Sequence, residues 1–296
     1  MTSHVDWIIV VNHRAGLRRS SQLFERLKAI LDTHSQKWLL VEVEEHEFAD
    51  DSLEAALLSH PRTKGIFILG GDGTVHHVAN KVLRINNEIP LAVIPTGSGN
   101  DFARQCGLLG HEFEGLVDHF LNQRPKDVDV LKVNDSFALQ VISTGFDAHV
   151  SRMARSRFRR LGRFRYSLIV PLQLFRMHAI EYDIAIDGQR MHITSPLVAV
   201  ANGNTYGGGM MISPASTVRD GVFELIFVSE MNRLELLRLF PRVFNGKHIN
   251  HPKVTQIRGR QLSLRASTIA ESDGEELSES PIDLIVTVTR LKTWVA

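Results

Sequence analysis

The first third of the chain alternates short apolar runs with stretches of helical periodicity, and this alternation restricts the folds open to it. Apolar residues such as Val75, Val78 and Val82 recur at helical spacing between the runs. Four runs have the length and continuity of buried strands. They are Trp7 to Val11, Trp38 to Val43, Ile66 to Leu69 and Leu91 to Ile94. Buried strands that alternate with amphipathic helices predict a parallel sheet covered on both faces.

The rhythm changes near Asp127, after which strand-like runs follow one another with few helices. One exception is Leu234 to Phe244, which has helical spacing, and Asp187-Gly188 is a hairpin-turn signal. The runs are Val128 to Val133, Phe137 to Ile142, Tyr182 to Ile186, Met191 to Val200, Val222 to Val228, Val254 to Ile257, Gln261 to Leu264 and Ile282 to Val288. Consecutive strands favour an antiparallel sandwich. We therefore predict an α/β domain over residues 1–127 and a β-sandwich domain over residues 128–289.

The composition is that of a globular protein, with 43% apolar and 23% charged residues. The one cysteine, Cys106, excludes an internal disulfide framework and suits a reducing compartment. A formal net charge of +1 gives no global attraction to nucleic acid, so we expect no nucleic-acid partner. No apolar run reaches the roughly 18–20 residues of a spanning helix, and the N-terminus lacks a signal-peptide pattern. We expect a soluble, cytoplasmic protein that contacts membranes only peripherally.

Three of the four N-terminal strands end in a polar or glycine-rich loop. In an open parallel sheet, ligands bind beyond the carboxyl ends of the strands. Backbone N–H groups at the start of a helix, together with the helix dipole, attract phosphate. The loops are Asn12 to Gly16, Gly70 to Thr74 and Pro95 to Asp101. Three such loops on one edge predict a site for a triphosphate.

Acidic residues in these loops need an explanation, because a carboxylate repels phosphate. Asp72 fits if a magnesium ion lies between it and the phosphates, and the alternative is a capping residue in a tight turn. Thr96, Gly97 and Ser98 offer hydroxyl and amide donors to a nucleotide. Asn100 and Asp101 either join this site or cap the helix that follows.

These loops and several later motifs resemble the diacylglycerol kinase catalytic family in its short bacterial form. The motifs occur in the family's order and cover nearly the whole chain. They are Gly70-Gly71-Asp72-Gly73-Thr74, Pro95 to Ala103, Ser143 to Asp147, Asn202, Gly207 to Met210, Pro214-Ala215, Asp220-Gly221 and Asp273-Gly274-Glu275. The first motif alone is shared with NAD kinases and phosphofructokinases, whereas the combination is far more specific.

The resemblance implies a doubly wound α/β domain like that of phosphofructokinase and NAD kinase, followed by a β-sandwich that holds the lipid. It also implies that the C-terminal tail, residues 290–296, returns to the first domain. Its implied ATP-contacting positions are Asn12, His13, Arg14, Ala15, Gly16, Gly70, Gly71, Asp72, Gly73, Thr74, Val75, His76 and Thr96. Gly97, Ser98 and Asn100 complete the predicted nucleotide site.

The resemblance implies further roles for acidic residues. Asp72, Asp101 and Asp129 correspond to the set that organises catalytic magnesium and its waters. Glu275 corresponds to the general base, which would take the proton of a lipid hydroxyl. Asp220 corresponds to a structural magnesium ligand, with the backbone carbonyls of Thr217 and Val222. From the residues alone, Asp273-Gly274 and Asp220-Gly221 are also compatible with simple turns, which would leave Glu275 solvated.

A basic segment lies in the second half of the chain, because no acidic residue occurs between Asp147 and Glu181. The region from Arg152 to Arg165 carries most of its arginines, interleaved with aromatic residues. Such a segment either docks on anionic lipid headgroups or forms a solvated basic face. The resemblance also allows a homodimer.

We therefore predict an ATP-dependent, magnesium-dependent kinase that phosphorylates a lipid hydroxyl on a diacylglycerol-like acceptor. Two alternatives remain at this stage. One is an NAD kinase-like or other small-molecule kinase that shares the first glycine-rich loop. The other is a noncatalytic lipid-binding regulator on the same fold. The sequence does not indicate which lipid is the acceptor.

Overall fold

The computed structural model describes residues 4–12, 19–43, 51–146, 148, 178–229 and 231–296. The predicted nucleotide contacts His13, Arg14, Ala15 and Gly16, and the basic region from Arg152 to Arg165, lie outside these residues. The chain divides into two compact units, of which unit 1 comprises Met1–Val128 with Arg290–Ala296 and unit 2 comprises Asp129–Thr289. Strands β5 and β16 each contribute residues to both units.

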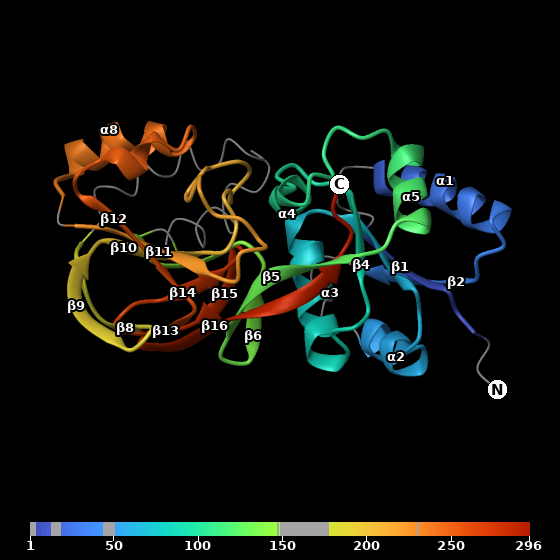
Figure 1. Ribbon diagram of the computed structural model, residues 1–296, viewed down its shortest axis with the longest axis horizontal. Coiled ribbons are helices and arrows are strands. Elements are labelled where there is room, and N and C mark those ends of the chain that lie inside the picture. Colours follow the sequence, from blue (N-terminus) through green and yellow to red (C-terminus); the bar gives the residue numbers. More distant parts are fainter. Residues whose placement is uncertain (1–3, 13–18, 44–50, 147, 149–177, 230) are drawn as a thin grey trace. The chain divides into compact units, whose positions relative to one another are not determined.

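Unit 1 is built on a parallel sheet with the strand order β2-β1-β3-β4 (Figure 1). Its strands are β1 (Trp7–Asn12), β2 (Trp38–Val43), β3 (Gly65–Gly70) and β4 (Leu91–Pro95), and the end of β16 (Ile282–Thr293) pairs in parallel with β4. Its helices are α1 (Arg19–Thr33), α2 (Asp51–Ser59), α3 (Asp72–Ile85), α4 (Asp101–Gln105) and α5 (Phe113–Asn122). Every residue of β1 and β3 is buried, as expected for strands covered on both faces.

The strand order reverses in the middle of this sheet. The chain passes from β1 to β2 on one side and then returns to β3 on the other side of β1. Right-handed crossovers therefore put α1 on one face and α2 with α3 on the opposite face, where α2 packs against α3. The carboxyl ends of β1 and β3 lie at this reversal, which is where doubly wound sheets bind their ligands.

The C-terminal residues complete the core of unit 1. Trp294 packs against the rings of Trp7 and Phe120, each at a centroid distance of 5.7 Å. Its indole N–H donates to the carbonyl of Gln123 at 2.8 Å, and the N–H of Ala296 donates to the carbonyl of Cys106 at 3.0 Å. Buried aromatic rings are among the largest contributors to core stability, so the tail is an integral part of unit 1.

Unit 2 is built on two antiparallel arrays of strands. One sheet contains β16, β13 (Gln261–Ala266), β8 (Ile180–Ile186) and β9 (Gln189–Ser195) in that order, with β5 (Lys126–Val133) pairing β16 and β6 (Ser136–Ala138). The other has the order β12 (Val254–Gly259), β11 (Phe223–Val228), β10 (Leu197–Ala201), β7 (Val141–Gly145), β14 (Ala270–Ser272) and β15 (Glu275–Ser278).

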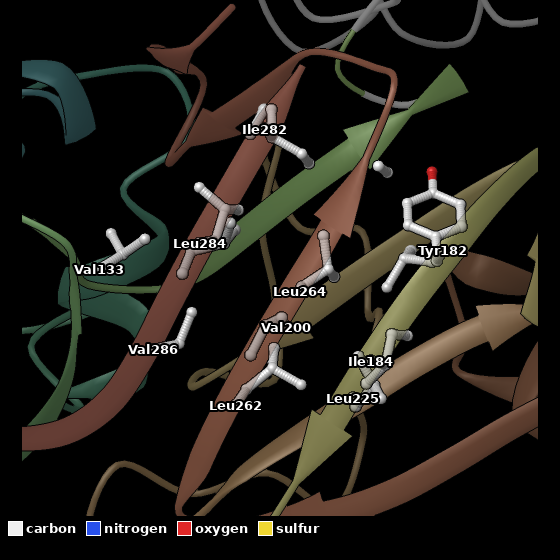
Figure 2. Close-up of a cluster of buried hydrophobic side chains, with 14 of the residues drawn as sticks. Val133, Tyr182, Ile184, Val200, Leu225, Leu262, Leu264, Ile282, Leu284 and Val286 are labelled. Carbon is white, nitrogen blue, oxygen red and sulfur yellow. The ribbon is translucent and has the colours of Figure 1, made fainter. Parts of the chain in front are cut away.

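The core of unit 2 lies between these sheets. Figure 2 shows Ile184, Leu264 and Leu284 of one sheet in the same cluster as Val200 and Leu225 of the other. Strand β8 alternates buried and exposed residues, as a strand with one face on a core should. The prediction of an α/β domain followed by a β-sandwich is confirmed.

Two predicted strands are wrong in detail, because each is divided in the structure. Met191 to Val200 becomes β9 and β10, which belong to different sheets and are separated at Pro196, a residue without the N–H that a strand ladder requires. Phe137 to Ile142 becomes β6 and β7, because the N–H groups between them bond to a side chain instead of a strand. The short strands β14 and β15 were not predicted.

The described part of unit 2 also contains the helix α8 (Arg233–Val243) and the 3-10 helix η3 (Lys247–Asn250). The start of α8 is fixed by a capping box, in which Asn232 accepts from the N–H of Glu235 and Glu235 accepts from the N–H of Asn232. None of the helices in the described part of the chain combines the length and apolar character that a bilayer crossing requires.

Candidate functional site

Buried side chains connect the loops at the carboxyl ends of the strands of unit 1. Asn12 is the last residue of β1, and its amide donates to the hydroxyl of Thr74 in the first turn of α3 at 3.0 Å. The hydroxyl of Ser20 in α1 donates to that of Thr96, just after β4, also at 3.0 Å. These hydrogen bonds join Asn12 to Thr74 and Ser20 to Thr96, and all of these residues lie at or after the carboxyl ends of β1, β3 and β4.

The two glycine-rich loops touch through their backbones. A Cβ atom on Gly97 would lie 2.6 Å from the Cα of Gly71, and one on Gly70 would lie 2.5 Å from the Cβ of Thr74. The N–H of Thr96 donates to the carbonyl of Gly70 at 3.0 Å, which continues the pairing of β3 and β4 into the loops. The distance between the two backbones therefore requires glycine at position 97, and it leaves little room at position 71, where a Cβ atom would lie 3.2 Å from the Cα of Gly97.

Asn100 closes the third loop upon itself. Its side-chain oxygen accepts from the N–H of Gly97 at 3.0 Å, and its amide donates to the carbonyl of Gly97 at 2.8 Å. Asn100 is in the left-handed conformation with φ of 54°, which asparagine tolerates better than most residues. The side chain of Asn100 thus shapes the loop and does not cap α4, while Ser98 is exposed at the loop's tip.

Asp72 and Asp101 form a pair of crowded carboxylates. Asp72 begins α3, and its carboxylate accepts from the N–H of Phe102 at 3.4 Å, at the start of α4. Burial, together with the charge of buried Asp101, raises the pKa of Asp72 to about 6. The capping alternative for Asp72 therefore holds in modified form, since Asp72 contacts the N-terminus of α4 and not that of its own helix.

The acidic pair suits a cation, because two adjacent carboxylates are stabilised by a positive charge between them. Within the described ranges, no group of three or more His, Cys, Asp or Glu side chains could hold a metal ion by itself. A magnesium ion beside Asp72 and Asp101 would therefore take its other ligands from water and phosphate oxygens, as magnesium in nucleotide sites does. The carboxylates of Asp72 and Asp101 therefore fit their predicted role of holding magnesium.

Val75 and His76 lie in the interior of unit 1. Their side chains are only 2% and 7% exposed, and the N–H of Val75 donates to the carbonyl of Gly71 at 3.0 Å within the first turn of α3. Burial with the neighbouring His76 lowers the pKa of His77 to about 4, so His77 is neutral at physiological pH. The predicted ATP contacts of Val75 and His76 stay predictions.

In unit 2, Asp129 is fully buried and held by three different segments. Its N–H donates to the carbonyl of Val218 at 2.7 Å, and its carboxylate accepts from the N–H of Gly221 at 2.7 Å. The buried amide of Asn202 donates to the carbonyls of Asp129 and Leu139, each at 2.7 Å. Asn202 was part of a motif without an assigned role, and this structure shows that it joins β5 to the turn between β6 and β7.

The Asp273-Gly274 turn joins β14 to β15 and presents Glu275. Asp273 and Gly274 have φ of 52° and 85°, and Glu275 begins β15, partly buried. The carboxylate of Asp273 accepts from the N–H groups of Leu139, Gln140 and Val141 at 2.6, 2.8 and 3.0 Å. The turn alternative is therefore right for Asp273-Gly274, and the same turn fixes the position of Glu275. No sequence signal gives these three donors, because they lie about 130 residues away.

Asp220 takes part in an ion pair. Its carboxylate lies 2.6 Å from the guanidinium of Arg258, which also contacts Glu224 at 3.1 Å. The other carboxylate oxygen accepts from the N–H of Val222 at 3.3 Å, and Gly221 has φ of 72°. At the predicted site of Asp220, Thr217 and Val222, the guanidinium of Arg258 would compete with a metal for the carboxylate of Asp220. That site stays a prediction, whereas the turn alternative describes the observed geometry.

The motif from Ser143 to Asp147 contributes to packing where it is described. The hydroxyl of Thr144 lies 3.2 Å from that of Tyr182, and burial raises the pKa of Tyr182 to about 12. A Cβ atom on Gly145 would lie 2.6 Å from the carbonyl oxygen of Pro196. The glycine therefore allows β7 to approach the segment between β9 and β10.

Comparison with known proteins agrees with this geometry. The family described as diacylglycerol kinase catalytic domain matches residues 6–133, and the family described as YegS C-terminal NAD kinase beta sandwich-like domain matches residues 140–293. A diacylglycerol kinase of Bacillus anthracis has a similar crystal structure, with a TM-score of 0.78 and 20% identity, covering 100% of this chain and 99% of that one. At this identity, the likeness shows a shared fold.

Curated relatives provide the sequence evidence. A diacylglycerol kinase of Mycobacterium tuberculosis is 30% identical over 230 residues, which cover 75% of this chain and 74% of the relative. A diacylglycerol kinase of Bacillus subtilis is 27% identical over 203 residues, which cover 68% and 67%. The first family match covers the loops of unit 1, and the second covers most of unit 2. This chain therefore belongs to the diacylglycerol kinase catalytic domain family.

Proposed function

We propose that this protein is an ATP-dependent lipid kinase, which transfers the γ-phosphoryl group of ATP to a hydroxyl of a diacylglycerol-like acceptor and requires Mg²⁺. The observation that carries the proposal is the crowded pair Asp72 and Asp101 beside two glycine loops that touch at Gly71 and Gly97. Phosphate oxygens need close backbone approach, and carboxylates next to phosphates need a divalent cation. The loop cluster of unit 1 provides both the glycine backbone for the phosphates and the carboxylates for the cation.

The residues of unit 1 would bind and orient the nucleotide. The backbone of the loops at Gly70 to Thr74 and Thr96 to Ser98 would surround the phosphates, while Asp72 and Asp101 would hold Mg²⁺ through its waters. When bound, Mg²⁺ neutralises charge on the phosphates of the triphosphate. Because phosphoryl transfer depends mainly on positioning and charge stabilisation, a rigid loop cluster suits this reaction.

The residues of unit 2 would act on the acceptor. Glu275 would accept the proton of the lipid hydroxyl as that oxygen attacks phosphorus, and Asp273 holds the turn that presents it. Asp129 is proposed as the third acidic residue of the magnesium-organising set. The amide of Asn202 donates to its backbone carbonyl, so Asn202 has the part of a positioning residue.

The first test is transfer of labelled phosphate from ATP, with Mg²⁺, to lipids in mixed micelles. Diacylglycerol, monoacylglycerol, sphingoid base and phosphatidylglycerol would be compared in parallel with the Glu275→Ala variant. We expect a labelled lipid that the variant does not form. Transfer only to soluble acceptors, with NAD tested first, would replace the proposal with a small-molecule kinase. Nucleotide binding without any transfer would indicate a noncatalytic regulator.

Three further expectations accompany the proposal. They are a cytoplasmic location with peripheral membrane contact, docking through the region from Arg152 to Arg165, and a homodimer. Each stays a prediction. Fractionation of cells, vesicle binding of a variant with neutralised arginines in that region, and analytical ultracentrifugation would test them in turn.

A further inference from the structure

Large apolar side chains with high exposure are concentrated on one helix of unit 2. Leu234, Leu237 and Phe244, on α8 and its C-cap, are 65%, 41% and 42% exposed. In the described ranges, the other large apolar side chains of this kind are Leu58 on α2 and Ile285 on β16, each on a separate element. Single exposed apolar residues are ordinary, whereas a group of them marks an interaction surface.

The exposed residues form one stripe along α8. Leu234, Leu237, Pro241 and Phe244 follow one another at spacings of three, four and three residues, which puts them on the same side of a helix. The opposite side packs on the protein, because Leu236 and Leu239 belong to a buried cluster with Met210, Val228 and Met231. Figure 1 shows α8 outside the sheet that contains β10, β11 and β12. The helix therefore has two apolar faces, and among the residues that the structure describes only the inner one is covered.

Positive charges flank the outer stripe. Arg233, Arg238 and Arg242 are exposed, and no described acidic group forms a salt bridge with any of them. The one acidic residue of α8, Glu235, has its carboxylate 2.9 Å from the ammonium group of Lys253. The outer face of α8 thus combines apolar side chains with three arginine charges that its own unit leaves unneutralised in the described residues.

We propose that the outer face of α8 docks onto an anionic phospholipid membrane. The face is defined by Leu234, Leu237, Pro241 and Phe244 together with Arg233, Arg238 and Arg242. The apolar stripe would enter the boundary between headgroups and acyl chains, while the arginines remain at the level of the phosphates. The proposal rests on the proposed function in one respect, since docking would bring the enzyme to a lipid acceptor.

The positive charge on the outer face of α8 favours a membrane as its partner over a second copy of the chain. In a symmetric dimer the same face meets itself, so three arginines from each copy would be brought together without acidic partners. An anionic lipid surface attracts all of them, and it has no fixed shape that the stripe must match. A cavity of about 470 Å³ adjoins the stripe at Leu234 and gives the face an apolar recess.

Binding to vesicles without nucleotide tests the apolar part of the face. Sedimentation with phosphatidylglycerol–phosphatidylcholine vesicles would compare the wild type with the triple variant Leu234→Gln, Leu237→Gln and Phe244→Gln. We expect binding at least about 30-fold weaker, because three inserted side chains are lost. The matched control is Leu58→Gln with Ile285→Gln, which removes apolar residues of 63% and 62% exposure elsewhere and should bind as the wild type does.

The charged part has its own test. Each of Arg238→Gln and Arg242→Gln should weaken binding about five-fold at low salt, and the effect should shrink as salt is added. Arg62→Gln with Arg190→Gln is the control, since both arginines are exposed away from α8, Arg62 in the turn before β3 and Arg190 on β9. Vesicles of phosphatidylcholine alone should bind the wild type weakly. Equal binding by the arginine variants and the wild type would overturn the electrostatic basis of the proposal.

A short-chain diacylglycerol, dissolved below its micelle concentration, separates docking from catalysis. The triple variant should phosphorylate it as fast as the wild type does, and should be slower only on vesicles. If the wild type bound anionic vesicles but phosphorylated no lipid, the proposed lipid kinase activity would be refuted, whereas membrane docking through α8 would still stand. A triple variant that binds vesicles as the wild type does would refute docking. Loss of a dimer with unchanged vesicle binding would also refute docking and assign the face to a second copy.

Discussion

The loop cluster of unit 1 and the acidic turns of unit 2 use aspartate in opposite ways. In unit 1, Asp72 and Asp101 crowd each other, and the pKa of Asp72 is raised to about 6 by burial and by this repulsion. In unit 2, the carboxylate of Asp273 accepts three backbone N–H groups. Satisfied carboxylates stabilise a fold, whereas crowded ones reduce stability and are retained where a ligand needs them. Asp273 therefore stabilises the scaffold, whereas the crowded pair Asp72 and Asp101 has the character expected of carboxylates that bind a ligand.

The largest expected effect is on catalysis, from Glu275→Gln. The variant keeps the size of the side chain but has no group to accept a proton, so kcat should fall about 10² to 10⁴-fold. Because Glu275 is only partly buried, the melting temperature should stay within about 2 °C of the wild-type value. The measurement is phosphoryl transfer to the best acceptor, with thermal unfolding alongside it.

The neighbouring Glu276→Gln is the control, since Glu276 is exposed on the same short strand and should retain activity. Equal losses in both variants would mean that β15 is merely sensitive to substitution. Full activity in Glu275→Gln would remove the general base from the proposal.

Gly97→Ala should have the next largest effect, and it acts on the backbone of unit 1. The new methyl group would lie 2.6 Å from the Cα of Gly71, so the two loops must separate. We expect ATP affinity to fall about 10 to 100-fold, because misplacement of phosphate contacts by an ångström is costly. Isothermal titration calorimetry with a nonhydrolysable ATP analogue measures this affinity. Gly115→Ala, where a Cβ meets nothing within 4 Å, should bind as the wild type does. Normal binding by Gly97→Ala would show that the loop contact is dispensable.

The two regions also differ in how much of them the sequence predicts. The loops of unit 1 follow directly from local patterns, since β3 and β4 end in glycine-rich segments and parallel strands bring their carboxyl ends to one edge. The contact between Gly71 and Gly97 follows from the adjacency of those strands.

The arrangement of unit 2 depends on long-range partners, so local patterns miss much of it. Asp273 bonds to residues about 130 positions earlier, and β14 and β15 are too short to give a periodic signal. The division of Met191 to Val200 at Pro196 was visible as a proline, but the change of sheet was not. The pairing of Asp220 with Arg258 joins residues 38 positions apart, which spacing alone cannot predict.

Asp273→Ala should destabilise unit 2 by about 2–3 kcal/mol, because three backbone N–H groups lose their acceptor. Activity should fall as well, since the turn presents Glu275. Urea unfolding measures the change in the free energy of unfolding. Asp187→Ala is the matched control, because Asp187 occupies the same kind of Asp-Gly turn and also accepts backbone N–H groups, but is exposed. Equal losses in the two variants would mean that the partly buried acceptor Asp273 contributes no more to stability than the exposed acceptor Asp187.

Asp72→Asn tests the other kind of aspartate and should stabilise the protein. The folded-state pKa of about 6 exceeds the unfolded value near 3.8, so the folded protein holds the proton more tightly. The folded state therefore loses stability as pH rises from about 4 to about 6, and the deficit persists at higher pH. The asparagine variant carries no such deficit, and partial exposure limits the expected gain at pH 7.5 to about 1–2 kcal/mol.

Urea unfolding at pH 7.5 and at pH 4.5 measures this gain without nucleotide. The advantage of Asp72→Asn should shrink at the lower pH, because the wild-type carboxyl is then mostly protonated in the folded state and only part of the deficit has built up. Mg²⁺ with ATP should reverse the order at pH 7.5, since ligands stabilise only the form that binds them. If Asp72→Asn raised the free energy of unfolding equally at both pH values, the cause would be packing and not the charge of Asp72. If Asp72→Asn lowered the free energy of unfolding at pH 7.5 without ligand, Asp72 would be a stabilising carboxylate like Asp273.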